Sequence, residues 1–170
     1  MTDATHDPAA DEAGAFEAEL AAVAPAAFGL ARRLGGRPDE AADTVQDACC
    51  QAWRYRRTRR GEFKPWFLAI VHRSARRRVA WITLPSAWQP SLAAGAASDP
   101  AAGFDPDLAE ALAGLPRRQR LALWLRYGED LSTADAAAVM GISDTALKQL
   151  AMRGREGLRA RLAGAGEAWR

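Results

Sequence analysis

The sequence is poor in the side chains that build metal sites and thiol chemistry: its 170 residues include two cysteines and two histidines. Cys49 and Cys50 are neighbours, and His6 and His72 lie far from them along the chain, so no typical spacing of zinc ligands is present. A Ser/His/Asp set and a phosphate-binding glycine loop are also missing. We therefore expect no metal, no cofactor and no catalysis, and we expect both cysteines to be reduced and buried.

Long apolar runs and strand-like alternation are scarce as well. The stretch WFLAIV at 66–71 is far too short to cross a bilayer, and the N-terminus lacks the basic start and apolar run of a signal peptide. We expect a cytoplasmic protein. No segment alternates apolar and polar residues for long enough to predict a strand, whereas helical spacing recurs throughout, which predicts an all-α chain.

Charge of one sign is missing from one part of the chain and nearly missing from another. Residues 1–20 contain acids and no Lys or Arg, and residues 54–78 contain ten bases against the single acid Glu62. This sorting predicts an acidic tail and a surface that binds a polyanion. The alternative is a basic face that is only solvated.

Local signals divide the chain into helices. An apolar stripe that begins at Phe16 predicts the first, and Pro25, Pro38 and Pro65 each predict the first turn of another. We expect the third helix to end near Tyr55. From this pattern we predict a disordered acidic tail at 1–13, a helical domain at 14–81, a linker at 82–105, a second helical domain at 106–163 and a tail at 164–170.

The second domain contains a helix-turn-helix pattern. Ser132 with Asp135 three residues on predicts the start of a short helix, Gly141 marks a turn, and Ser143 predicts the start of a longer helix. In DNA-binding proteins the second helix of this pattern enters the major groove. Helical hairpins without DNA share the spacing, but the Arg-rich flanks favour DNA.

Three blocks in order carry a family resemblance: DEAADTVQDACCQAW, GEFKPWFLAIVHRSARRR and LPRRQRLALWLRYGEDLSTADAAAVMGIS. With them the chain resembles the extracytoplasmic-function (ECF) group of the bacterial sigma-70 family. The resemblance implies a sigma2-like and a sigma4-like domain joined by a flexible linker. It also implies a non-enzymatic protein that binds core RNA polymerase, reads the minus-ten and minus-thirty-five promoter elements, and is restrained by an anti-sigma factor.

The block around the third helix implies the polymerase contact. Asp43, Gln46 and Asp47 fall at i, i+3 and i+4, so they share one helix face. An acidic patch is useless for binding phosphate but suits a basic protein surface, which is what the resemblance assigns to it. The alternative is a solvated face.

The next block implies the minus-ten contacts. Tyr55 among arginines offers a stacking surface in a cationic setting, which suits unstacked bases, unless Tyr55 packs inward at the end of its helix. Arg73 and Arg77 stand where the family usually has Asn and Asp, which strengthens phosphate attraction and leaves base choice less predictable. The predicted DNA contacts of the first domain are Tyr55, Arg56, Arg57, Arg59, Lys64, Arg73, Arg76 and Arg77.

The last helix departs from the family pattern. Leu147, Ala151, Gly154 and Leu158 share an inward stripe, and we expect Leu150 and Met152 to flank the groove-facing side. Its surface either touches thymine methyl groups or faces a protein partner. The predicted DNA contacts of the second domain are Arg117, Arg118, Thr145, Lys148, Gln149, Met152, Arg153 and Arg155.

Two other functions remain open at this point. One is a sigma-like mimic that binds an anti-sigma protein without reading promoters, which the altered last helix would allow. The other is a free-standing helix-turn-helix regulator, although such a protein needs neither the acidic patch nor a separate first domain.

Overall fold

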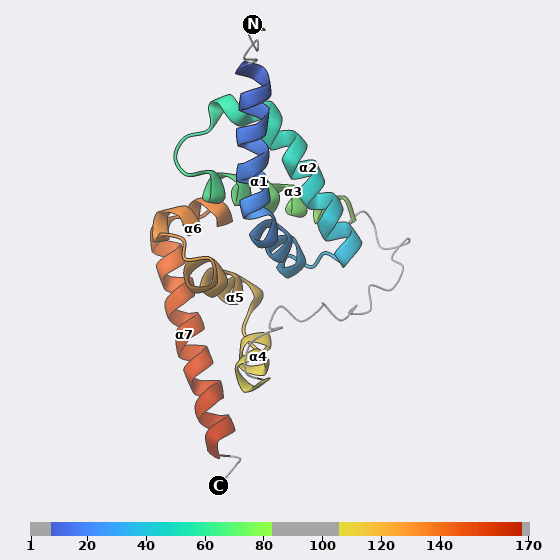
Figure 1. The fold of residues 1–170 in the computed structure, drawn as a ribbon. Helices are drawn as coiled ribbons and strands as arrows, with labels where there is room; N and C mark the ends of the chain where they lie inside the picture. The colour runs from blue at the N-terminus through green and yellow to red at the C-terminus, as the bar shows by residue number, and fades with distance from the viewer. Residues whose placement is uncertain (1–7, 83–105, 168–170) are drawn as a thin grey trace, which may run out of the picture.

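The computed structural model describes residues 8–82 and 106–167, which are helices and turns without a strand, as predicted (Figure 1). The first half comprises α1 (Pro8–Arg33), α2 (Pro38–Tyr55), a 3-10 turn η1 (Arg56–Thr58) and α3 (Phe63–Ile82). The second half comprises α4 (Pro106–Ala113), α5 (Arg117–Leu123), a π-helical turn η2 (Trp124–Gly128), α6 (Thr133–Met140) and α7 (Asp144–Glu167). The predicted linker lies outside the described residues except for Ile82, the last residue of α3.

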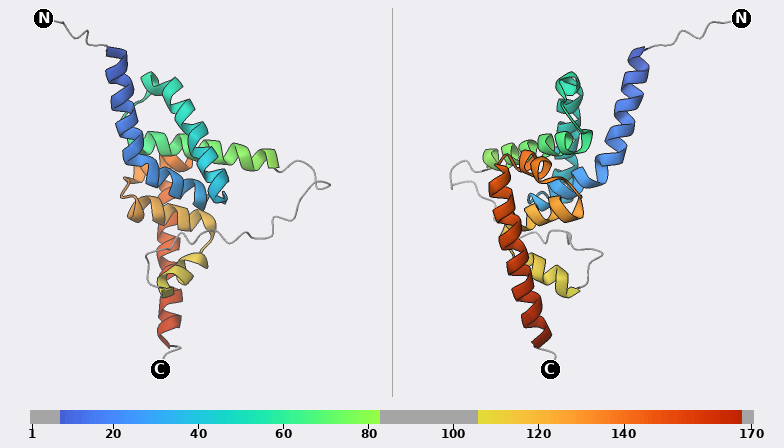
Figure 2. Two further views of the ribbon diagram at one scale, coloured as in Figure 1. Left: turned by 45° about the vertical axis from the view of Figure 1, so that its right-hand side comes forward. Right: turned by 90° about the vertical axis from the view of Figure 1, so that its left-hand side faces the viewer.

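Helix α1 is longer than predicted at its start and continuous where we expected a break. Residues 8–13, assigned to a disordered tail, form its first turns, with Pro8 at a position that needs no amide donor. Pro25 lies inside the helix rather than opening a new one, and Figure 2 shows that α1 changes direction midway. An interior proline costs about 3 kcal/mol. Burial of Ala26, Ala27 and Leu30 directly after it offsets that cost.

Helix α1 is also long and apolar enough, by length and composition, to pass as a membrane span. An 18-residue window within the stretch Asp11–Arg33 has a mean hydropathy of 1.2. A core helix passes the same test, and Val23, Ala27 and Leu30 are almost completely buried against the rest of the fold. Core packing therefore accounts for part of the apolar character of α1, since 28% of the apolar window is buried.

Helix α2 has the predicted bounds and presents a narrow face of small residues to the core. Ala41, Ala48 and Ala52 have no exposed surface, and the buried Thr44 hydroxyl donates to the Glu40 carbonyl at 2.7 Å. Small side chains allow close approach to both α1 and α3, which α2 contacts about equally. The predicted burial of both cysteines is wrong, because Cys49 is only partly buried and Cys50 is exposed. The buried face of α2 is formed by alanines and Thr44, and the cysteines lie outside it.

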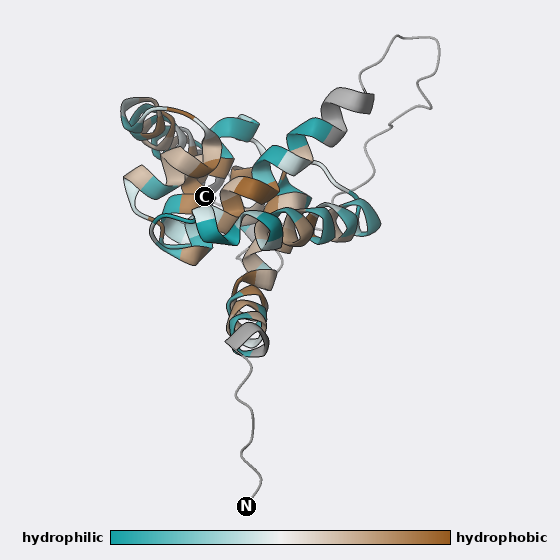
Figure 3. Cartoon of the chain, turned by 90° about the horizontal axis from the view of Figure 1, so that it is seen from above, coloured by the Kyte–Doolittle hydropathy of each residue, from teal (hydrophilic) through white to brown (hydrophobic). Residues whose placement is uncertain are grey.

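Helix α3 lies between the two halves. It contacts α1 and α2 of the first half and α6 of the second half. Its residues Phe67, Leu68 and Val71 are fully buried. One cluster of buried residues runs from Phe16 through α3 to Leu147 in α7. The two helical units are thus packed together rather than held only by a linker. Figure 3 shows the same distribution, with apolar residues where the helices cross and hydrophilic residues on the outer faces.

The helix-turn-helix is built as the local signals predict. Ser132 Oγ accepts from the Asp135 amide at 3.0 Å, and Ser143 Oγ accepts from the Ala146 amide at 3.2 Å. Gly141 ends α6 in the left-handed region at φ 63°, which favours glycine. Helix α7 continues to Glu167, past residue 163, where we expected the second domain to end.

The inward stripe of α7 is as predicted and explains how closely α7 approaches α5. Leu147 is fully buried and Ala151 nearly so. A Cβ at Gly154 would lie 3.0 Å from Leu123 Cδ1 and 3.4 Å from Gln119 Cβ, both on α5. Glycine at this position therefore sets the spacing of the two helices.

Candidate nucleic-acid interface

The connection from α2 to α3 carries five arginines, and we call residues 54–60 the basic loop. Tyr55, the last residue of α2, is 52% exposed. This exposure excludes the alternative in which Tyr55 packs inward. Arg54, Arg57 and Arg60 also point into solvent. The loop thus presents an aromatic ring among guanidinium groups, which is the combination used to hold unstacked bases and their phosphates.

A second aromatic ring lies beside this loop. Trp53 is 38% exposed, and the Arg56 guanidinium lies over its ring at 3.9 Å from the centroid. Trp53 also contacts Phe16 of α1, and the two rings meet edge-on with 5.1 Å between their centroids. Trp53 thus packs against the core on one side and is exposed on the other.

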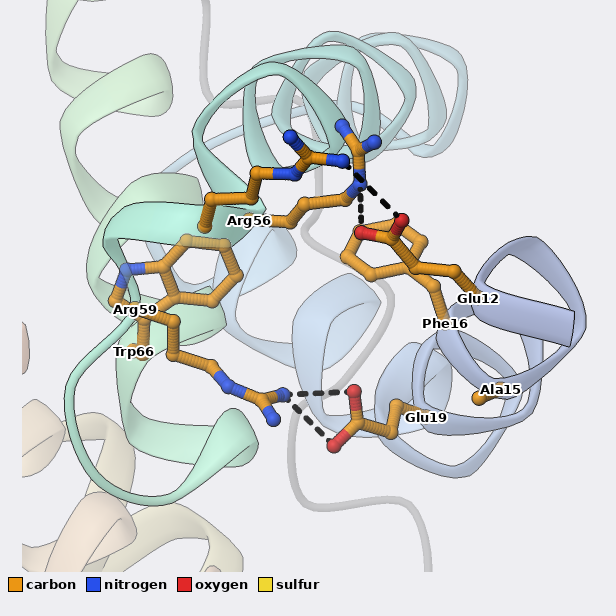
Figure 4. Close-up of a pocket in the computed structure, with 8 residues that line it drawn as sticks. Glu12, Ala15, Phe16, Glu19, Arg56, Arg59 and Trp66 are labelled. Atoms are coloured by element: carbon orange, nitrogen blue, oxygen red, sulfur yellow. Dashed lines mark hydrogen bonds and ion pairs between the residues drawn. The ribbon is translucent and has the colours of Figure 1, made fainter. Parts of the chain in front are cut away.

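Two carboxylates of α1 reach the basic loop, which the sequence did not lead us to expect. Glu12 accepts from Arg56 Nε at 2.8 Å and lies 3.6 Å from Arg57, and Glu19 accepts twice from Arg59 Nη1 at 2.7 Å (Figure 4). The hydrogen bond from Arg56 is the main cause that lowers the pKa of Glu12. The available signal was the spacing of Glu12 and Glu19 at i and i+7 around Phe16, which places all three on one helix face.

Between α1 and the basic loop lies an open hollow of about 240 Å³. Its lining includes Glu12, Phe16, Arg56 and Trp66. Small-molecule sites usually enclose roughly 300–1,000 Å³ and are mostly apolar. The size, openness and ion pairs of this hollow fit a surface for a polyanion better than a pocket for a small ligand.

Helix α3 carries a basic stripe of its own. Arg73, Arg76 and Arg77 are exposed and lie at i, i+3 and i+4 on one face. Lys64, which we grouped with them, is engaged elsewhere: its Nζ lies 2.9 Å from the Glu129 carboxylate and donates to the Glu129 carbonyl at 3.0 Å. Lys64 therefore ties α3 to η2 in this arrangement.

The packing of the halves brings the arginines of α5 close to those of α3. His72 is buried at this junction, and burial lowers its pKa to about 4, with further lowering by Arg76, Arg73, Arg117 and Arg118. Arg117 also donates to the Arg33 carbonyl at 3.3 Å. Arg117 and Arg118, predicted to bind phosphates, thus share a positively charged region with α3.

The acidic patch of α2 is on the surface. Asp43, Gln46 and Asp47 are all exposed, on the side of α2 away from the buried Ala41 and Ala48. The first half therefore carries an exposed acidic patch on α2 and exposed arginines on the basic loop and α3.

In α7 the structure separates exposed side chains from packing residues. Leu150 is half-buried and packs against the main core, so its predicted place at the groove-facing side is wrong. Met152 is 45% exposed. The exposed side chains of this segment that we predicted to contact DNA are Thr145, Lys148, Gln149, Met152, Arg153 and Arg155.

Metal chemistry has no candidate centre in the part of the chain that the structure describes. Within residues 8–82 and 106–167, no group of three or more His, Cys, Asp or Glu side chains could hold a metal ion.

Comparison with known proteins identifies both halves. The family model for sigma-70 region 2 matches residues 20–80, and the model for sigma-70 region 4 matches residues 106–158. The sigma factor RpoE of Bartonella quintana, solved with the anti-sigma factor NepR, is similar with a TM-score of 0.62 and 27% identity, over 87% of this chain and 96% of that one. CnrH, solved with the cytosolic domain of CnrY, shares the fold with a TM-score of 0.62 at 24% identity, over 88% of each chain.

A curated relative is more similar over a shorter stretch. The RNA polymerase sigma factor FliA of Pseudomonas aeruginosa is 43% identical over 60 residues, which is 35% of this chain and 24% of that protein. The chain thus spans about a quarter of this relative. Regions 2 and 4 nevertheless occur in order and account for both helical units. The chain belongs to the sigma-70 family, as a sigma factor of the extracytoplasmic-function group.

Proposed function

We propose that the protein binds core RNA polymerase through the acidic patch of α2 and directs it to promoters, reading the minus-ten element with the first half and the minus-thirty-five element with α7. The observation that carries this proposal is the separation of charge in the first half. Asp43, Gln46 and Asp47 are exposed on one face, and the basic loop and the α3 stripe are exposed elsewhere. A protein that works on polymerase acts in the cytoplasm.

The acidic patch suits a protein partner better than DNA. Two carboxylates one helical turn apart repel phosphate and attract a basic surface, and the amide of Gln46 between them adds directional hydrogen bonds. We propose a basic face of the polymerase clamp as the partner of this patch.

The basic loop and α3 suit opened DNA. Tyr55 and Trp53 supply ring faces on which bases stack, while Arg57, Arg73 and Arg77 attract the backbone. Bases become available for stacking only when the strands separate, so this surface fits the minus-ten element of an opened promoter.

Helix α7 retains the side chains of a reader. Leu150 and Ala151 pack inward, so these two apolar side chains do not replace polar side chains on the groove-facing side. Lys148, Gln149, Met152 and Arg153 are exposed; in this proposal the polar three supply hydrogen bonds and Met152 contacts a thymine methyl group. This arrangement favours promoter recognition over the mimic.

We also propose that an anti-sigma factor restrains the protein. The support is the similarity, at 27% identity over most of both chains, to a sigma factor solved with its anti-sigma factor.

In-vitro transcription tests the proposal. Purified protein with core polymerase on a genomic library should yield run-off transcripts, and Asp47→Arg should abolish them. Glu17→Arg, the same charge change at an exposed position of α1, should leave them intact. Polymerase binding without any transcript would support the mimic instead. Sequence-specific binding by the protein alone would support a free-standing regulator.

A further inference from the structure

The charges that are sorted along the sequence meet in the fold. On α1, Glu12, Phe16 and Glu19 occupy one face at i, i+4 and i+7. Phe16 is 7% exposed, with ring centroids of Trp53 and Phe63 at 5.1 and 5.6 Å. The aromatic contact fixes the position of this face, and the two carboxylates lie on either side of it (Figure 4).

Each carboxylate holds arginines of the basic loop. Glu12 binds Arg56 at 2.8 Å and approaches Arg57 at 3.6 Å, and Glu19 binds Arg59 through both oxygens at 2.7 Å. The side chains of Arg56 and Arg59 are 23% and 33% exposed, whereas that of Arg57 is 80% exposed. Arg56 and Arg59 are therefore drawn against α1, whereas Arg57 remains in solvent.

Carboxylates and phosphates use the same donors. A guanidinium group presents a planar set of N–H donors that either anion accepts, so an arginine paired with Glu is not available to a phosphate in the same geometry. Ion pairs with this much exposure are weak, and a polyanion that brings several phosphates at once displaces them readily.

We propose that the first turns of α1 act as an internal competitor for nucleic acid, in which Glu12 and Glu19 occupy Arg56 and Arg59 until single-stranded DNA displaces them. This inference rests on the proposed role of the basic loop in binding DNA. Its consequence is that the free protein binds nucleic acid weakly, and that an event which lifts the start of α1 raises the affinity.

A purely structural role for these ion pairs makes the opposite prediction. If Glu12 and Glu19 only fasten α1 to the loop, their removal loosens the loop and lowers the affinity for DNA or leaves it unchanged. The direction of the change in affinity thus separates the two roles.

The test measures binding of the full chain to a fluorescent single-stranded oligonucleotide of mixed sequence by anisotropy. Removing both carboxylate charges in Glu12→Gln/Glu19→Gln should raise the affinity about tenfold at low salt, since each additional phosphate contact contributes roughly threefold. The slope of log affinity against log salt should steepen by about 1.4 if two arginines are released, at about 0.7 per phosphate on single strands.

Glu17→Gln is the matched control. It removes one charge from the same helix at an exposed position about 140° around the helix from Glu12, and it belongs to none of the ion pairs among the described residues. It should change the affinity less than about twofold, since it releases no arginine. If the double variant melts early, Glu19→Gln alone gives the same comparison with one charge removed.

Arg57→Ala separates failure of this inference from failure of the proposed function. A loss of affinity in Arg57→Ala, together with no gain in Glu12→Gln/Glu19→Gln over Glu17→Gln, would overturn the competition and leave the loop as the DNA site. If Arg57→Ala binds like the unchanged protein, the role of the loop in DNA binding is wrong, and the competition falls with it.

Discussion

Leu147 packs the second helix of the helix-turn-helix into the core. It is fully buried at the start of α7 and belongs to the core that also contains α3 and α6. Leu147→Ala should lower the free energy of unfolding by about 2–5 kcal/mol, because it removes buried apolar surface and leaves a cavity. Urea denaturation measures this change. Lys148→Ala, one residue on and exposed, should change it by less than about 0.5 kcal/mol, and equal effects of the two would contradict the burial.

His72 gives the fold a pH dependence that a surface histidine would not. Burial and the arginines Arg73, Arg76, Arg117 and Arg118 lower its pKa from 6.5 to about 4. The unfolded chain therefore takes up a proton on this side chain at a pH where the folded chain does not. The stability from neutral His72 is fully present above pH 6.5 and is lost as the pH falls towards 4.

His72→Gln should remove this part of the pH dependence. Between about pH 7 and about pH 4.5 the unchanged protein should lose more stability than the variant, as measured by urea denaturation at each pH. Parallel pH profiles would mean that His72 titrates alike in the folded and unfolded chains.

At the scale of single residues, the sequence predicted burial well where a stripe was continuous and poorly where the face was narrow. Leu147 and Ala151 lie inward because they belong to a stripe of four small or apolar residues on one face of α7. Two predictions were wrong by about one position around the helix: Cys50 was predicted to be buried and is exposed, and Leu150 was predicted near the groove-facing side and packs inward. A difference of 100° between neighbouring residues separates core from solvent, and only the partner helix decides which side is covered.

At the scale of elements, helix starts were predictable because their signals are local. Pro38, Ser132 and Ser143 mark starts that the structure confirms, and each serine hydroxyl accepts a hydrogen bond from the amide three residues on. The continuity of α1 through Pro25 was not predictable in this way. It depends on burial against α2 and α3, which lie later in the chain.

Lys64 of α3 and Glu129, the residue after η2, form an ion pair across the two halves. Glu129→Lys should loosen the contact, because it places two ammonium groups together, and the exchange Lys64→Glu/Glu129→Lys should recover most of the loss. A double-mutant cycle on urea denaturation should give a coupling of about 1 kcal/mol, at the upper end for exposed pairs because the Glu129 side chain is 16% exposed. Strictly additive effects would mean that the two charges do not interact in solution.

For the candidate site, the sequence predicted the arginines and the acidic patch but not what lies against them. The basic loop was evident from composition, and exposure of Tyr55 follows from its place at the end of α2. The pairing of the loop with Glu12 and Glu19 involves residues about 40 positions apart. Contacts at that separation depend on the angle between helices, which no local pattern encodes.

At the scale of the whole molecule, the shared core predicts cooperative unfolding. Buried residues of both halves belong to one cluster, so opening either half exposes apolar surface of the other. Calorimetry should therefore record a single transition rather than one for each half. Two well-separated transitions would mean that the halves fold independently and touch only loosely.

The packing of α6 against α3 also means that the covalent connection is not what keeps the halves together. A protease site inserted between residues 83 and 105 could be cut after folding, and the two fragments would still elute as one species from a sizing column. Two separate genes, each encoding one fragment, would then reconstitute the protein by complementation inside a cell.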